Sequence, residues 1–140
     1  MARHITRSHT VSELLGAHAA FTDPISFTER QLPVSLSPTP PPPTAILLAY
    51  SLGSLFLILA ALNILCTSVT RDVRTTRYYL MILACGDMGH MWANYIGMGS
   101  EVFWNFDSYN EVMMGNVAIT VVLWTMRVLT LSGAFGRIGR

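Results

Sequence analysis

The longest apolar run of the chain is Ala45 to Val69, AILLAYSLGSLFLILAALNILCTSV, which contains no charged residue. About 20 helical residues, each rising 1.5 Å, cross a hydrocarbon core of roughly 30 Å. Because this run is longer than that minimum, it predicts a transmembrane helix with length to spare for tilting.

Two further apolar runs follow, each with one formally charged residue. Tyr78 to Met98, YYLMILACGDMGHMWANYIGM, carries Asp87, and Val112 to Phe135, VMMGNVAITVVLWTMRVLTLSGAF, carries Arg127. We therefore expect an all-α, multi-pass transmembrane helical bundle with spans near 45–69, 78–98 and 112–135.

The composition of the 140 residues agrees with a membrane protein, because 51% are hydrophobic and only 12% are charged. The nine basic residues are all arginines, and the formal net charge is +1. Such a chain has no basic surface of the kind that nucleic-acid binding requires. The lipid bilayer is the partner that we expect, and the sequence carries no signal for an oligomeric state.

The loops between the runs differ in the sign of their charge. The linker 70–77 has three arginines and one acid, whereas the loop 100–111 has three acids and no base. Positive residues in short loops stay on the cytoplasmic side, so the linker and the tail bearing Arg137 and Arg140 should be cytoplasmic. The acidic loop should face the opposite side, most simply across an endomembrane such as the endoplasmic reticulum.

Residues 1–43 precede the transmembrane helical domain that we expect over 44–140. They comprise a basic N-terminus, a short apolar helix near 11–22 and a proline-rich extramembrane spacer that includes SLSPTPPPP at 35–43. The apolar part of 11–22 is too short to span by itself. It reads as a shortened or interfacial helix, or as a secretory signal with an ill-placed Glu13.

The segments GDMGHMW (86–92) and GMGSEVFWNFDSYNEVMMGN (97–116) resemble a family of small fungal integral-membrane proteins built on one domain of unknown function. That resemblance covers the chain from about Ser12 onward and implies four apolar helices. VSELLGAHAAFTDPISFTERQLP (11–33) is similar to the end of the family's first helix and the proline-bearing loop behind it. At the start, the residues that would complete this helix are missing or replaced.

Polar side chains in the second and third runs lie on single helical faces. Asp87, His90 and Asn94 are spaced by three and four residues, which places them on one face. The third run has a similar stripe, formed by Asn116, Thr120, Trp124 and Arg127. Asp87 lies about 13 Å and Arg127 about 12 Å from the cytoplasmic ends of their helices, so the two stripes should face each other.

This arrangement has two interpretations. Asp87 and Arg127 can form a buried ion pair that fixes helix register, with Asn94 and Asn116 beside it, because an isolated charge in lipid is costly. Alternatively, His90 can exchange protons near neutral pH, with Asp87 orienting its ring, which would make both residues catalytic. We expect no metal site, because one His and one Asp supply at most two ligands, and no cofactor.

The acidic loop mixes aromatic side chains with carboxylates. The residues that we expect at the membrane interface are Glu101, Trp104, Asp107 and Glu111. This mixture suits an anchor at the membrane interface. The loop can also act as a lid over a pocket lined by His90, with Glu101 or Glu111 as a second acid.

Glycines within the runs should allow neighbouring helices to approach closely; they are Gly53, Gly86, Gly89 and Gly115. No phosphate loop, Gly-x-Ser-x-Gly motif, dinucleotide fingerprint or paired-cysteine motif is present.

The sequence thus indicates a small integral membrane protein of unassigned activity. The alternative is a membrane-embedded cyclase, isomerase or oxygenase that acts on a lipophilic small molecule. Some small membrane proteins of similar build serve fungal secondary metabolism in this way, which is an analogy of build only. A channel or transporter is a third class, although no internal repeat supports it.

Overall fold

The computed structural model describes the backbone of residues 2–70 and 72–136, and the side chains of those ranges from residue 10 onward. Within these ranges every regular element is helical. Arg71, Arg137 and Arg140, which enter the expected charge asymmetry, lie outside the described residues.

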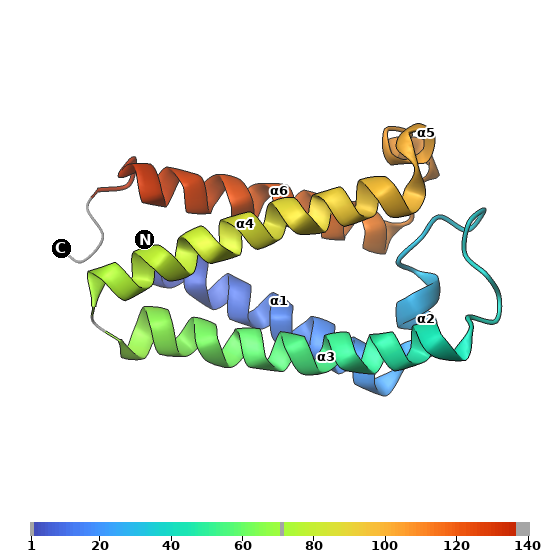
Figure 1. The fold of residues 1–140 in the computed structure, drawn as a ribbon, viewed down its shortest axis with the longest axis horizontal. Coiled ribbons are helices and arrows are strands. Elements are labelled where there is room, and N and C mark those ends of the chain that lie inside the picture. The colour runs from blue at the N-terminus through green and yellow to red at the C-terminus, as the bar shows by residue number, and fades with distance from the viewer. Residues whose placement is uncertain (1, 71, 137–140) are drawn as a thin grey trace.

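Four long helices run in alternating directions along the same axis (Figure 1). They are α1 (Ala2–Thr22), α3 (Pro43–Ile64), α4 (Val73–Met98) and α6 (Glu111–Ser132). They pack mainly as two pairs, α1 with α3 and α4 with α6. The start of α1, the α3–α4 connection and the end of α6 therefore share one end of the bundle.

Short elements connect the long helices. The segment η1 (Leu65–Val69) continues α3 as a π-helical turn. At the opposite end of the bundle lie α2 (Pro24–Glu29), α5 (Ser100–Phe103) and the 3-10 turn η2 (Phe106–Ser108).

Local signals set the ends of the helices. Asp72 caps α4, because its carboxylate accepts hydrogen bonds from the backbone N–H groups of Arg74 and Thr75. Asn110 caps α6 in the same way through the N–H of Met113, at 2.9 Å. Gly133 ends α6 in the left-handed region, with φ of 83°, where a residue with a side chain would be strained.

Two of the described helices are long and apolar enough to cross a membrane: α3 with its continuation, Pro43–Val69, and α6, Glu111–Ser132. Only 17% of each apolar window is buried inside the chain, whereas a core helix of a soluble protein would be mostly covered. The expected span 78–98 lies within the 26-residue helix α4 but does not meet the same criterion. The polar stripe of α4 lowers its hydropathy, so the third span stays a prediction.

The N-terminal helix is longer than the apolar segment 11–22 that we expected, since α1 begins at Ala2 and runs beside α3. Its contact with α3 is close. A Cβ at Gly53 would lie 3.1 Å from the Cβ of Ala20, and one at Gly16 would lie 2.9 Å from the ring of Phe56. Gly53 thus lies at a helix–helix contact, as the sequence suggested.

The other three glycines do not lie at such contacts. A Cβ at Gly86, Gly89 or Gly115 would meet nothing within 4 Å. The expectation that they bring helices together is therefore wrong within this chain. Gly86 and Gly89 lie on an open face of α4, because that helix packs against α6 through other residues.

The segment just before the proline-rich run is tied to the start of α6. The side-chain amide of Asn110 donates hydrogen bonds to the backbone carbonyls of Arg30 and Leu32, at 3.2 and 3.1 Å. Pro33, next in the chain, is fully buried. Beside it lies a small apolar core of Met98, Phe103 and Met113, against which Leu32 packs.

Candidate functional site: a polar centre between the helices

The centre of the bundle contains an ion pair between the two helices of the second pair. Arg127 on α6 binds the carboxylate of Asp87 on α4 through its guanidinium. The same guanidinium donates a hydrogen bond of 3.4 Å to the backbone carbonyl of Leu83. Arg127 is only 3% exposed and the side chain of Asp87 only 16%, so both charges are withdrawn from the surface.

The first helix contributes a second acid to this centre. Glu13 on α1 is 8% exposed, and its charge acts on Arg127. Tyr79 on α4 is also buried and lies close enough to interact electrostatically with both Glu13 and Arg127. Its hydroxyl donates a hydrogen bond of 3.4 Å to the backbone carbonyl of Leu59 on α3.

Sequence reasoning missed these contributions. In the sequence Glu13 only interrupts an apolar run, although a carboxylate within SELLGAHAA is itself a signal for an inward-facing partner. Asn63 on α3 is a further buried polar residue, and its amide donates to the hydroxyl of Thr10 on α1 at 3.1 Å. All four long helices therefore supply polar groups to the interior.

His90 lies in a different environment from Asp87. Its ring is exposed and lies 3.2 Å from the side-chain amide of Asn94, one turn along α4. The side-chain amide of Asn116, on α6, lies near enough to interact with the ring. Since the carboxylate of Asp87 is engaged by Arg127, amides rather than Asp87 orient the ring of His90 in this structure.

The polar stripe of α6 therefore serves two neighbouring groups. Arg127 belongs to the ion pair, and Asn116 belongs with His90 and Asn94. Thr120 lies between them, buried, with its hydroxyl bound to the backbone carbonyl of Asn116 at 2.8 Å. We call His90, Asn94 and Asn116 the imidazole–amide group.

The four side chains of the acidic loop that we expect at the membrane interface are exposed. The exposed residues are Glu101, Trp104, Asp107 and Glu111. Phe103 is the inward-facing aromatic residue, 6% exposed, and its ring stacks edge-on against Tyr95 at 5.4 Å between centroids. The anchor and lid interpretations of the loop both stay predictions.

Among the described side chains, those of residues 10–70 and 72–136, no group of three or more His, Cys, Asp or Glu is arranged to hold a metal ion. Both cysteines, Cys66 and Cys85, are free thiols. The described centre contains carboxylate, guanidinium, phenol, amide and imidazole groups.

Comparison with known proteins gives a family but no activity. The chain matches no curated protein and no solved structure. The model of one family matches residues 6–137, which is nearly the whole chain and agrees with the expected single domain of unknown function. The chain thus belongs to the family described as domain of unknown function DUF7704.

Proposed function

We propose that this chain is a multi-pass integral membrane protein with four spans, and that its imidazole–amide group binds the polar end of a lipophilic small molecule. The resemblance to small fungal membrane proteins supports a fungal source and an endomembrane location. The four-span arrangement is supported by α1 and α4, which lie alongside the two apolar helices and have 21 and 26 residues. These lengths suffice for a hydrocarbon core of roughly 30 Å.

The direction of the charged side chains also supports four spans. Asp87 and Glu13 turn inward, toward Arg127, instead of toward the surface of the bundle. Ionisable residues within membrane helices face the bundle interior and pair with one another because lipid does not solvate them. The exposed surface of α3 is meanwhile rich in leucine and isoleucine, such as Leu47, Leu48 and Ile58.

One observation carries the binding proposal: His90 is exposed although it lies within a proposed span. An exposed polar group at that depth is costly in lipid, so the polar end of a ligand that covers the ring would offset this cost. Asn94 and Asn116 add amide donors and acceptors beside the ring. Such a group suits a hydroxyl, carbonyl or carboxyl at the end of an apolar molecule.

A second candidate is an enzyme that uses proton transfer on such a molecule, of the cyclase or isomerase type. The ion pair occupies Asp87 and Arg127, whereas His90 is an exposed imidazole on the same helix as Asp87. Imidazole changes its protonation near neutral pH and commonly acts as a general acid or base.

The test compares purified wild-type protein with His90→Gln and Asn116→Leu. Alkaline carbonate extraction first establishes whether each chain stays in the membrane. Small molecules that co-purify are then extracted with solvent and quantified by mass spectrometry. We expect both variants to lose a bound compound that the wild type and Cys85→Ser retain, since Cys85 is an exposed residue of the same helix. Equal amounts in all four proteins would contradict ligand binding at this group.

The enzyme candidate needs one more measurement on the same strains. If His90 transfers protons, His90→Gln should keep its folded yield while the host loses the corresponding product. A fully active His90→Gln protein would end the acid–base proposal and leave binding to be decided by the co-purification result.

A further inference from the structure

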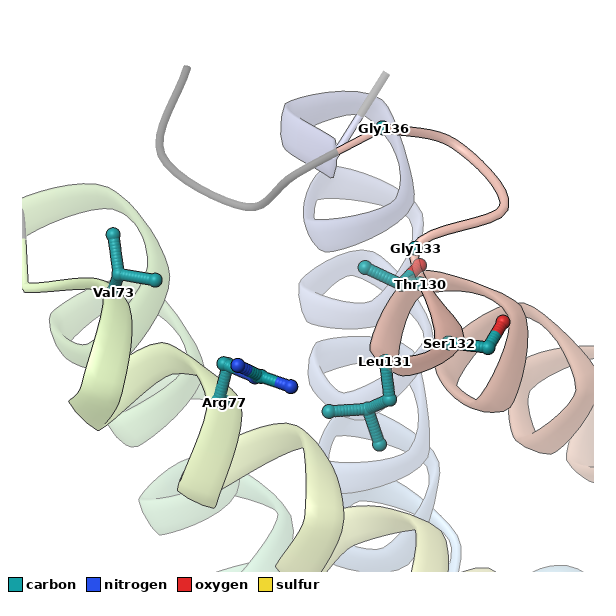
Figure 2. A pocket seen from close by; sticks show the side chains of 7 residues that line it. All are labelled: Val73, Arg77, Thr130, Leu131, Ser132, Gly133 and Gly136. Carbon is teal, nitrogen blue, oxygen red and sulfur yellow. The ribbon is translucent and has the colours of Figure 1, made fainter.

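A pocket of about 480 Å³ opens at the end of the bundle where α4 begins and α6 ends. Figure 2 shows its walls: Val73 and Arg77 come from the first turns of α4, and the other lining residues come from the end of α6 and the turn behind it. Those residues are Thr130, Leu131, Ser132, Gly133 and Gly136. The volume lies within the range of small-ligand pockets, roughly 300–1,000 Å³.

The α4 wall of this pocket is positively charged. The guanidinium of Arg77 points across the pocket toward α6 (Figure 2). In the described part of the chain no carboxylate pairs with it. The nearest acid in sequence, Asp72, is occupied at the α4 cap by the N–H groups of Arg74 and Thr75 and by the hydroxyl of Thr75, at 2.6 to 3.3 Å.

The α6 wall offers hydrogen-bond acceptors. In the turn that ends α6, the N–H of Gly133 donates a hydrogen bond to the carbonyl of Thr130 at 3.2 Å. The N–H of Gly136 donates one to the carbonyl of Gly133 at 2.9 Å. Among the described residues, no backbone N–H donates to the carbonyl of Leu131 or Ser132. Carbonyls at a helix C-terminus carry partial negative charge and attract donors and cations.

We propose that this pocket binds the headgroup of a glycerophospholipid, with its phosphate on Arg77 and an N–H or O–H donor of the headgroup on the α6 carbonyls. The inference rests on the proposed membrane spans, because the pocket then lies at the level of the headgroups. Basic pockets between the ends of transmembrane helices are known sites for phospholipid headgroups. Ethanolamine, serine, glycerol and inositol headgroups have the required donor, whereas the quaternary ammonium of choline has none.

The experiment uses the full chain in neutral detergent and counts bound lipid by native mass spectrometry. Phosphatidylethanolamine is the test lipid, phosphatidylcholine is the lipid without a donor, and glycerophosphoethanolamine is the soluble form of the same headgroup. We expect phosphatidylethanolamine to bind preferentially. Arg77→Gln should lower its occupancy about tenfold, as expected for a lost charge-assisted hydrogen bond, and Arg77→Lys should lower it less.

Two matched variants make the result specific. Arg74→Gln removes the same charge three residues away, at an exposed position that does not line the pocket, and should change occupancy less than twofold. Ser132→Trp keeps Arg77 but fills the pocket and should abolish binding. Because both positions are exposed, the variants should fold, and size-exclusion chromatography checks this.

The outcomes separate this inference from the proposed function. Equal losses in Arg77→Gln and Arg74→Gln, or equal binding of the two lipids, would overturn the headgroup site while leaving the membrane spans intact. Arg77-dependent binding of glycerophosphoethanolamine that matches the lipid would support the phosphate site but assign it to a soluble ligand. Release of the chain by alkaline carbonate would refute the membrane assignment by itself.

Discussion

Asp87 on α4 and Arg127 on α6 are 40 residues apart in sequence and form an ion pair inside the helix bundle. The pair links the two helices of one packing unit, and the influence of Glu13 on Arg127 extends the link to α1. The charges in the long helices thus take part in holding the bundle together.

The first prediction is that Asp87→Asn lowers the folded yield sharply. The substitution leaves the buried cation of Arg127 without its main partner, and breaking a buried pair in this way costs roughly 3–5 kcal/mol. Size-exclusion chromatography of detergent extracts measures the folded fraction. A yield equal to that of the wild type would end the view of this pair as a structural lock.

The second prediction concerns the exchange of the two charges, Asp87→Arg with Arg127→Asp. Opposite charges remain paired, so the yield should rise above that of Asp87→Asn. The recovery should be incomplete, because a carboxylate at position 127 would lie close to Glu13. Adding Glu13→Gln to the exchanged pair should raise the folded yield further. An unchanged yield would mean that the charge of Glu13 does not act on position 127.

The third prediction compares the same substitution at two glycines. Gly53→Val should destabilise the protein by about 1–3 kcal/mol, because its side chain would press on Ala20 and Phe21 of α1. Gly89→Val should have a much smaller effect, since the space around Gly89 is open. Thermal unfolding in detergent distinguishes the two. Similar losses at both sites would mean that Gly89 also has a close neighbour, such as another protein chain.

The fourth prediction is topological. With four alternating spans, the α2–α3 segment and the loop 100–111 share one side of the membrane, and the α3–α4 connection lies on the other. Glycosylation acceptors placed near Pro40 and in 100–111 should both be modified, whereas one near Arg74 should not. Modification at Arg74 would reverse the orientation. Modification at only one of the first two sites would mean that α3 or α4 does not cross, because these are the two helices between the sites.

The fifth prediction follows from the cap of α4. The side-chain hydrogen bond from Thr75, followed by the backbone N–H groups of Thr75 and Arg74, holds the pKa of Asp72 below its usual 3.8. A lowered pKa means that the ionised cap stabilises the folded state above pH 3.8 and that this contribution is lost as the pH falls through the lower, folded-state value. Asp72→Asn keeps a capping side chain but should lose that pH dependence. Melting temperatures between pH 6 and pH 3, taken for both proteins, provide the comparison.

Hydropathy predicts the apolar helices well but not where polar helices begin. The expected span 112–135 corresponds to Glu111–Ser132, whereas α4 begins at Val73, five residues before the expected start. Arginines are good helix formers on a surface, so the Arg-rich linker continues the helix up to its cap at Asp72. For the same reason, hydropathy does not detect the first half of α1, whose residues are largely polar.

The polar centre could be predicted only in part. Equal depth in antiparallel neighbours is enough to bring Asp87 and Arg127 together. The position of Glu13 depends on how α1 packs against α3 and α6, and no local spacing encodes that register. The neighbours of His90 also depend on tertiary packing. The guanidinium of Arg127 binds the carboxylate of Asp87, so the ring of His90 lies beside Asn94 and Asn116 instead.

The placement of Arg127 in the last described helix also has a consequence for biogenesis. Chains are synthesised from the N-terminus, so α4 leaves the ribosome before its counter-ion exists. If α4 spans the bilayer as proposed, Asp87 must be screened by water in the insertion channel or held by an insertion factor until α6 follows. The retention of α4 would then depend on a residue made 40 positions later, and a nascent chain stalled before α6 should be a preferred substrate for membrane quality control.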